Sequence, residues 1–190
     1  LNTYPSRSYT LGRLGAKFAR YLEENCPRED KAWADFMIDL ARLEWTFNEV
    51  FDGPGTEHDS LLTAEQLQTI TPEQWPHVSL ITVPSLRLLQ FSYPVSRFHG
   101  EKRKHDDTAI PEPCENYVAV SRREFIVRRI ELTRAQFELL QQITEGRPVG
   151  AAIAHAAEFY EGNFDQLAAE LQGWFRQWTV EQFFLRFQLP

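Results

Sequence analysis

The sequence has few cysteines, no clustered glycines and no long apolar run. Its 190 residues include two cysteines, Cys26 and Cys114, which are too few for a disulfide framework and lack the paired spacing of a zinc site. The nine glycines never gather into a loop that would cradle phosphate. No apolar run approaches the roughly 18 residues of a membrane-spanning helix, and no secretion signal is visible. These absences predict a protein of the reducing cytoplasm with no membrane partner.

Positive charge is also scarce. The chain carries 20 Lys and Arg against 27 Asp and Glu, which gives a net charge of −7. A DNA-binding domain usually presents a net basic face, because phosphate neutralisation dominates its affinity. The balance therefore disfavours nucleic acid but leaves a local basic patch open. The 43% of hydrophobic residues is a globular composition that can bury a sizeable core.

Signatures of bond chemistry are missing as well. The sequence has no Gly-x-Ser-x-Gly elbow and no recognisable catalytic cysteine signature. One cluster has ligand types that suit zinc or iron, although its spacing matches no known pattern: His99, His105, Asp106, Asp107 and Cys114. A solvated linker is the favoured interpretation of that cluster, and a metalloenzyme is the alternative. We therefore expect a protein that is not an enzyme, with no catalytic residues, no bound metal and no cofactor.

Apolar spacing predicts that the first half of the chain is mainly helical. The pattern indicates one helix over about residues 11–25 and a stronger one over about residues 31–51. Further helix starts are predicted at Thr63 and at Thr71, which both begin capping sequences. For the apolar stretch 78–93 we favour extended structure through Val83, and a short helix after Pro84 is an open alternative.

The second half has a different pattern. Residues 117–120 and 125–127 flank a polar turn and predict a β-hairpin. Three helices should follow, beginning near Thr133, Pro148 and Asn163, before a terminal stretch that alternates like a strand. The third helix carries an apolar stripe made of Phe164, Leu167, Leu171, Trp174, Phe175 and Trp178.

We therefore predict a mainly α fold with a small β-sheet, of the α+β class. An N-terminal helical domain would occupy residues 1–98, a linker residues 99–115, and a winged-helix-like domain residues 116–190.

Two groups of residues are candidates for binding. The predicted hairpin is basic, and its arginines are suited to an acidic peptide added at a sheet edge or to DNA phosphates: Arg122, Arg123, Arg128 and Arg129. The third helix presents mainly acidic and amide side chains, which makes DNA the weaker alternative. Trp45, which falls off its helical stripe, and Trp75, beside Pro76, are candidates for docking a protein partner.

Three segments of this sequence resemble one bacterial family. They are the run DLARLEW at residues 39–45, the run PSLRLL at residues 84–89 with YPV at 93–95, and the turn PSRS at residues 5–8. Their order and spacing are similar to those of the HvfC/BufC family, whose members are described as DNA-binding domain proteins. Arg87, within the second run, is a third docking candidate.

The resemblance implies a function as well as a fold. Members of that family are partner proteins of multinuclear non-heme iron oxidases that modify ribosomally made peptides. The chain would then be an accessory protein that binds both an iron-dependent oxidase and its precursor peptide, with the C-terminal domain as the peptide recognition element. The family has further helices ahead of the PSRS turn, which would make residues 1–98 an incomplete helical domain. A DNA-binding transcriptional regulator stays open as the alternative.

Overall fold

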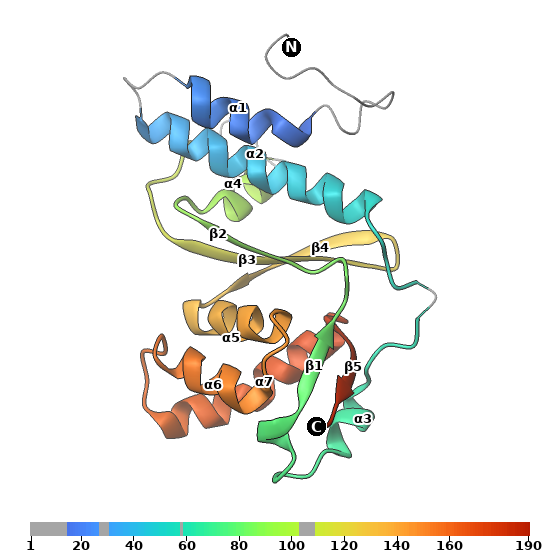
Figure 1. Ribbon diagram of the computed structural model, residues 1–190. Helices are drawn as coiled ribbons and strands as arrows, with labels where there is room; N and C mark the ends of the chain where they lie inside the picture. Colours follow the sequence, from blue (N-terminus) through green and yellow to red (C-terminus); the bar gives the residue numbers. More distant parts are fainter. Residues whose placement is uncertain (1–14, 27–30, 58, 103–108) are drawn as a thin grey trace.

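The computed structural model describes residues 15–26, 31–57, 59–102 and 109–190 (Figure 1). Helices and a smaller share of strands are both present, so the predicted α+β class is confirmed. The helices are α1 (Phe18–Asn25), α2 (Lys31–Asp52), α3 (Ala64–Gln68), the 3-10 helix η2 (Trp75–His77), α4 (Val95–Lys102), α5 (Arg134–Thr144), α6 (Val149–Ala157) and α7 (Phe164–Val180). The strands are β1 (Ser79–Thr82), β2 (Arg87–Phe91), β3 (Asn116–Arg123), β4 (Ile126–Leu132) and β5 (Phe184–Gln188).

A three-stranded antiparallel sheet lies between two layers of helices. Its strand order is β2-β3-β4, with α1, α2 and α4 on one side and α5, α6 and α7 on the other (Figure 1). Side chains alternate across the sheet, so Val118 and Val120 of β3 pack with α2 while Tyr117 and Ala119 pack toward α5. Burial of both faces explains why residues 117–120 are apolar without interruption.

Both sheets join segments that are far apart in the sequence. Strand β2 pairs with β3, placing Leu88 opposite Ala119, and β1 pairs with β5 in a second, two-stranded sheet that places Leu80 opposite Phe187. One strand of each pair comes before residues 99–115 and the other comes after them. The predicted helical domain therefore contains two strands that complete the sheets of the second half.

Several local predictions need correction. The segment after Pro84 is not a helix but strand β2, because β3 offers it a ladder of backbone hydrogen bonds that no isolated sequence pattern reveals. Residues 99–102 of the predicted linker belong to helix α4. The helix predicted to start at Thr71 is a turn that leads into η2, after which the backbone at Val78 is extended.

Other predictions are confirmed. The β3–β4 hairpin forms, but β3 runs on to Arg123, so the turn is Glu124–Phe125 and not the predicted polar stretch 121–124. Helices α3, α5 and α7 each begin with a capping box, at Thr63, Thr133 and Asn163. The second predicted helix is α2 with almost the predicted bounds. The first begins at Phe18 after a 3-10 segment at residues 15–17, and residues 11–14 of its predicted range lie outside the described residues. The stripe of α7 is buried or half-buried except for Phe164, which is 69% exposed in the first turn.

Two of the segments that carry the family resemblance contact each other. The buried carboxylate of Asp39 on α2 accepts hydrogen bonds from the backbone N–H groups of Ser92 and Tyr93, at 2.7 and 3.2 Å. Arg42 lies 3.3 Å from the other carboxylate oxygen. Burial raises the pKa of Asp39 although these hydrogen bonds and Arg42 oppose the shift. Residues 39–45 therefore fix the turn between β2 and α4, while the PSRS run at residues 5–8 lies outside the described residues.

Candidate functional site

The candidate arginines begin with Arg122, near the end of β3. Its side chain is only 9% exposed, and its Nε lies 2.8 Å from the Glu57 carboxylate in a two-pronged ion pair. Its Nη1 also donates to the carbonyl oxygens of Val50 and Phe51, in the last turn of α2. A guanidinium provides five donors in a rigid fork, which suits this cluster of acceptors. Arg122 thus anchors the hairpin to α2 and is turned inward from the surface.

The hairpin turn itself has an unusual backbone. Glu124 and Phe125 are its two central residues, with φ values of 51° and 62°. Positive φ at both positions is the geometry of a type I′ turn, which normally carries Asn or Gly. The Phe125 side chain is 65% exposed at the tip of the hairpin, within 6.0 Å of the Arg122 guanidinium. Two residues with side chains are therefore held in a conformation that favours glycine.

The other three hairpin arginines also contact the protein. Arg123 donates to the carbonyl oxygen of Val180, the last residue of α7, at 3.0 Å. Arg128 is about half exposed and lies 3.7 Å from Glu181. Arg129 lies over the Phe47 ring at 5.6 Å. The structure thus places the four predicted arginines around one hairpin but turns them toward different neighbours, and Arg128 is held most loosely.

Strand β4 is an edge of the three-stranded sheet. Its partner β3 lies on one side, and none of the described strands lies on the other. The register pairs Arg123 with Ile126 across the two-residue turn, so Ile126 and every second residue after it bond to β3. The backbone groups of Val127 and Glu131 therefore point away from β3. They offer donors and acceptors to a further strand.

Two of the predicted docking residues lie in the packing around α2. Arg87 on β2 donates to Glu49 of α2 at 2.9 and 3.1 Å and to the carbonyl oxygens of Pro84 and Leu86. The half-buried ring of Trp45 on α2 lies beside Gly15, where an added Cβ would come within 3.3 Å of it.

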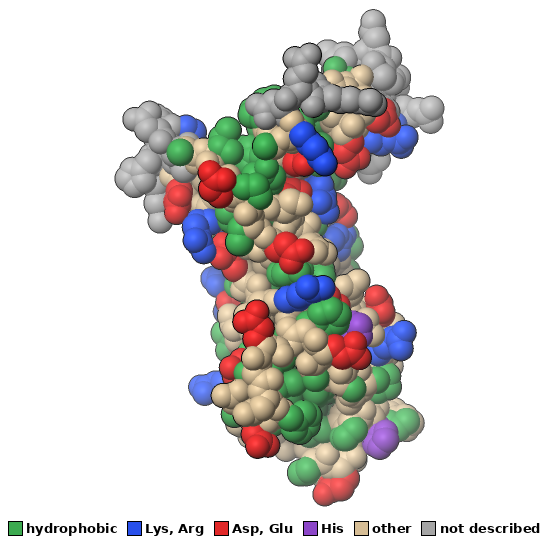
Figure 2. Space-filling model, turned by 90° about the vertical axis from the view of Figure 1, so that its left-hand side faces the viewer, with side chains coloured by type: hydrophobic (Ala, Val, Ile, Leu, Met, Phe, Trp, Pro, Cys, Tyr) green, Lys and Arg blue, Asp and Glu red, His purple; other side chains and the backbone are tan. Residues whose placement is uncertain are grey.

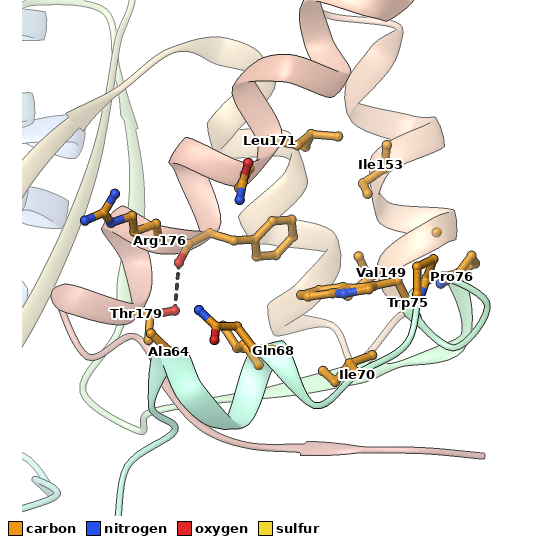
Figure 3. Close-up of a pocket in the computed structure, with 15 residues that line it drawn as sticks. Ala64, Gln68, Ile70, Trp75, Pro76, Val149, Ile153, Leu171, Arg176 and Thr179 are labelled. Atoms are coloured by element: carbon orange, nitrogen blue, oxygen red, sulfur yellow. Dashed lines mark hydrogen bonds between the residues drawn. The ribbon is translucent and has the colours of Figure 1, made fainter.

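The third docking residue, Trp75, lines a groove of about 820 Å³ (Figure 3). One wall is formed by residues 64–76, and the other by helices α6 and α7. The Trp75 ring lies 5.5 Å from the ring of Phe175, and Figure 3 shows it at the same end of the groove as Val149 and Ile153. Gln68 and Arg176 lie at the other end. The sequence pattern singled out Trp75 as a docking candidate but gave no sign of the opposite wall of the groove, because the contact with Phe175 joins segments about a hundred residues apart.

The groove is held open by backbone contacts. The N–H of Val149 donates to the carbonyl oxygen of Val78 at 2.8 Å, which ties the start of α6 to β1. Gly150 packs so closely on the η2 segment that an added Cβ would lie 2.8 Å from the carbonyl oxygen of Pro76. The space therefore exists before any ligand arrives, as is usual for binding clefts.

The residues of the alternative metal site do not gather in the part of the chain that the structure describes. His99 lies in α4 with its ring 5.2 Å from that of Phe47, and Cys114 is exposed ahead of β3. His105, Asp106 and Asp107 lie outside the described residues. Elsewhere in the described ranges, no group of three or more His, Cys, Asp or Glu side chains is placed to hold a metal ion.

Charges of both signs are interspersed on the face shown in Figure 2, and hydrophobic side chains gather toward its lower part. This face carries no continuous basic surface of the kind that tracks a nucleic-acid backbone. None of the helices within the described ranges combines the length and apolar character needed to cross a bilayer.

No family model and no curated protein matches this chain. A function is therefore proposed below from the geometry of this chain's own residues and from the resemblance of its sequence segments.

Proposed function

We propose that this chain is a non-catalytic accessory protein that binds a ribosomally made precursor peptide and presents it to an iron-dependent oxidase. In this proposal β3, β4, α5–α7 and β5 form a winged-helix-like unit, and the peptide adds to β4 as a further strand. The observation that carries the proposal is the open edge of β4, where the backbone groups of Val127 and Glu131 point away from the sheet. Strand addition needs such an edge, because backbone hydrogen bonds supply most of its affinity.

The side chains around this edge suit an acidic peptide. Arg128 is 46% exposed, and its contact with Glu181 is long at 3.7 Å, so it can exchange that partner for a peptide carboxylate. Arg97 on α4 is 68% exposed and lies 3.6 Å from Glu131, beside the same strand. Arg122, in contrast, is engaged with Glu57 and the end of α2. Its part in the proposed site is to hold the hairpin in place.

The partner enzyme is proposed from the family resemblance. An accessory protein that binds both the peptide and the enzyme raises the local concentration of the modifiable segment at the iron centre. The alternative, a DNA-binding regulator, has less support because Arg122 is turned inward and because α7, which is capped by Asn163, carries Asp165 in its first turn. A phosphate backbone would meet an acidic helix start there.

Capture on the tagged full chain, read by mass spectrometry, tests the proposal first. Recovery of an iron-dependent oxidase together with a small ribosomal peptide is expected, and selective recovery of DNA would instead favour the regulator.

Titration of the recovered peptide then tests the edge. Glu131→Pro removes an outward N–H and should weaken binding by about tenfold or more, because one strand-addition hydrogen bond is lost and the proline ring obstructs the edge. Glu131→Gln keeps the N–H and is the matched control for the side chain. Equal affinity of the wild-type and Glu131→Pro proteins would exclude strand addition at β4.

A further inference from the structure

The groove beside Trp75 is separate from the β4 edge and has no part in the proposed peptide site. Its volume of about 820 Å³ falls in the range of clefts that enclose ligands, about 300–1,000 Å³. Residues on opposite walls are packed against each other through Trp75 and Phe175, so the groove is a preformed feature.

The lining divides into an apolar end and a polar end. Trp75, Val149 and Ile153 gather at one end, and Gln68 and Arg176 lie at the other (Figure 3). Large apolar side chains of a ligand would fill the first end, where an aromatic ring and two aliphatic side chains face the space. A polar group of the same ligand would then lie at the second end.

The polar end of the groove carries positive charge only. Arg176 is exposed, it is the sole charged residue of the lining, and no acidic residue lines the groove. Across the described part of the chain, Arg176 makes no hydrogen bond or ion pair, and the amides of Gln68 and Gln172 make no hydrogen bond. A carboxylate is the complementary group for a guanidinium without a partner. An amide side chain offers one donor and one acceptor group, which matches the C=O and N–H of a peptide backbone.

We infer that this groove binds an apolar peptide segment of a partner protein that carries an acidic side chain at the Arg176 end. The apolar residues of the segment occupy the Trp75 end, and its carboxylate pairs with Arg176. Gln68 and Gln172 hold the backbone between them. The groove is thus a second binding surface, and no residue of β4 lines it.

Selection of displayed random 12-residue peptides on the full chain tests the inference without knowledge of the partner. The expected consensus has two or more large apolar residues and one Asp or Glu. Selected peptides that add to the β4 edge are recognised because Glu131→Pro weakens them, whereas groove peptides are insensitive to that change. Failure of the β4-edge proposal and failure of the groove proposal are therefore distinguishable.

A charge swap then locates the peptide carboxylate. Arg176→Glu should weaken the consensus peptide by about tenfold, because an ion pair becomes a repulsion. A peptide with Lys at the acidic position should bind the Arg176→Glu protein with restored affinity. The same peptide should bind the wild-type protein weakly. Arg186→Glu, a charge reversal at another exposed arginine, on β5 and outside the groove, is the matched control and should leave affinity unchanged.

Three results would overturn the inference: no apolar-acidic consensus, a consensus bound equally by the Arg176→Glu protein, or a Lys peptide that fails to recover affinity for that protein. Ile153→Ser tests the apolar end separately. It should weaken the consensus peptide by more than any loss of folded protein explains, and urea unfolding of the same variant measures that loss, because the partly buried Ile153 also packs against the core.

Discussion

The guanidinium of Arg122 lies 2.8 Å from the carboxylate of Glu57, and the two residues are 65 positions apart in the chain. The pair connects the β3–β4 hairpin to the segment that follows α2. Because Arg122 also binds two carbonyl oxygens at the end of α2, a single side chain fixes the hairpin against the upper helical layer.

Arg122→Lys is expected to destabilise the protein although it conserves charge. Lysine presents one ammonium group and cannot match the fork that bonds Glu57 and the α2 carbonyl oxygens together. The urea midpoint should fall clearly for Arg122→Lys. Arg128→Lys, at a half-exposed position with a long contact, should change the free energy of unfolding by about 0.5 kcal/mol or less. Equal midpoints for the two variants would contradict the anchoring role.

The stabilising effect of Arg122 should depend on pH. Its hydrogen bond to Glu57 holds the pKa of that carboxyl below its ordinary value of 4.5. A lowered folded-state pKa contributes stability that is present above pH 4.5 and lost as the pH falls through the folded value. The stability difference between the wild type and Arg122→Lys should therefore be constant near neutral pH and shrink below about pH 4.5. Urea titrations at a series of pH values measure it, and a constant difference would argue against the ion pair.

The contribution of Asp39 to stability should change with pH in the opposite direction to that of Glu57. Burial raises its pKa from the ordinary value of 3.8, so its contribution to stability is greatest below that pH and declines as the pH rises through the folded value. Asp39→Asn keeps an oxygen for the N–H groups of Ser92 and Tyr93 and should remove this decline at a cost of about 1 kcal/mol or less. Asp39→Ala leaves both donors unbonded and should cost about 2 kcal/mol or more. Equal losses for the two variants would show that the hydrogen bonds contribute little.

The hairpin turn should be improved by residues that favour positive φ. Replacing Glu124 with Asn and Phe125 with Gly removes the strain of two side chains at φ values of 51° and 62°. A gain of about 1–2 kcal/mol in the free energy of unfolding is expected. Thermal unfolding measures the gain. A loss of stability would mean that the contact of the Phe125 ring with Arg122 stabilises the fold by more than the positive φ of Phe125 destabilises it.

The elements that the sequence predicted best depend on neighbours within about twenty residues. Capping boxes at Thr63, Thr133 and Asn163 use residues three positions apart, and the β3–β4 hairpin pairs adjacent segments. The sequence of strand β2 is ambiguous because its partner β3 is about thirty residues away, and an apolar stretch interrupted by Pro84 suits more than one structure.

The candidate sites show the same limit. A run of arginines in a hairpin predicted a basic surface, but only the three-dimensional contacts show that Arg122 points to Glu57. Trp75 stood out from its neighbours in sequence, whereas the lining that it shares with Arg176 comes from α7, about a hundred residues later. The open edge of β4 follows from strand order, which no local pattern encodes.

The pairing of β1 with β5 and of β2 with β3 makes the two halves of the chain complementary fragments. If the chain were cut between α4 and β3, two strands in each piece would lose a hydrogen-bonded neighbour. The larger hydrophobic core would also be divided, because both pieces contribute side chains to it. We therefore expect the two fragments to reassemble into the native fold when they are mixed. Fused to the two halves of a split reporter, the fragments would restore its activity when they bind each other.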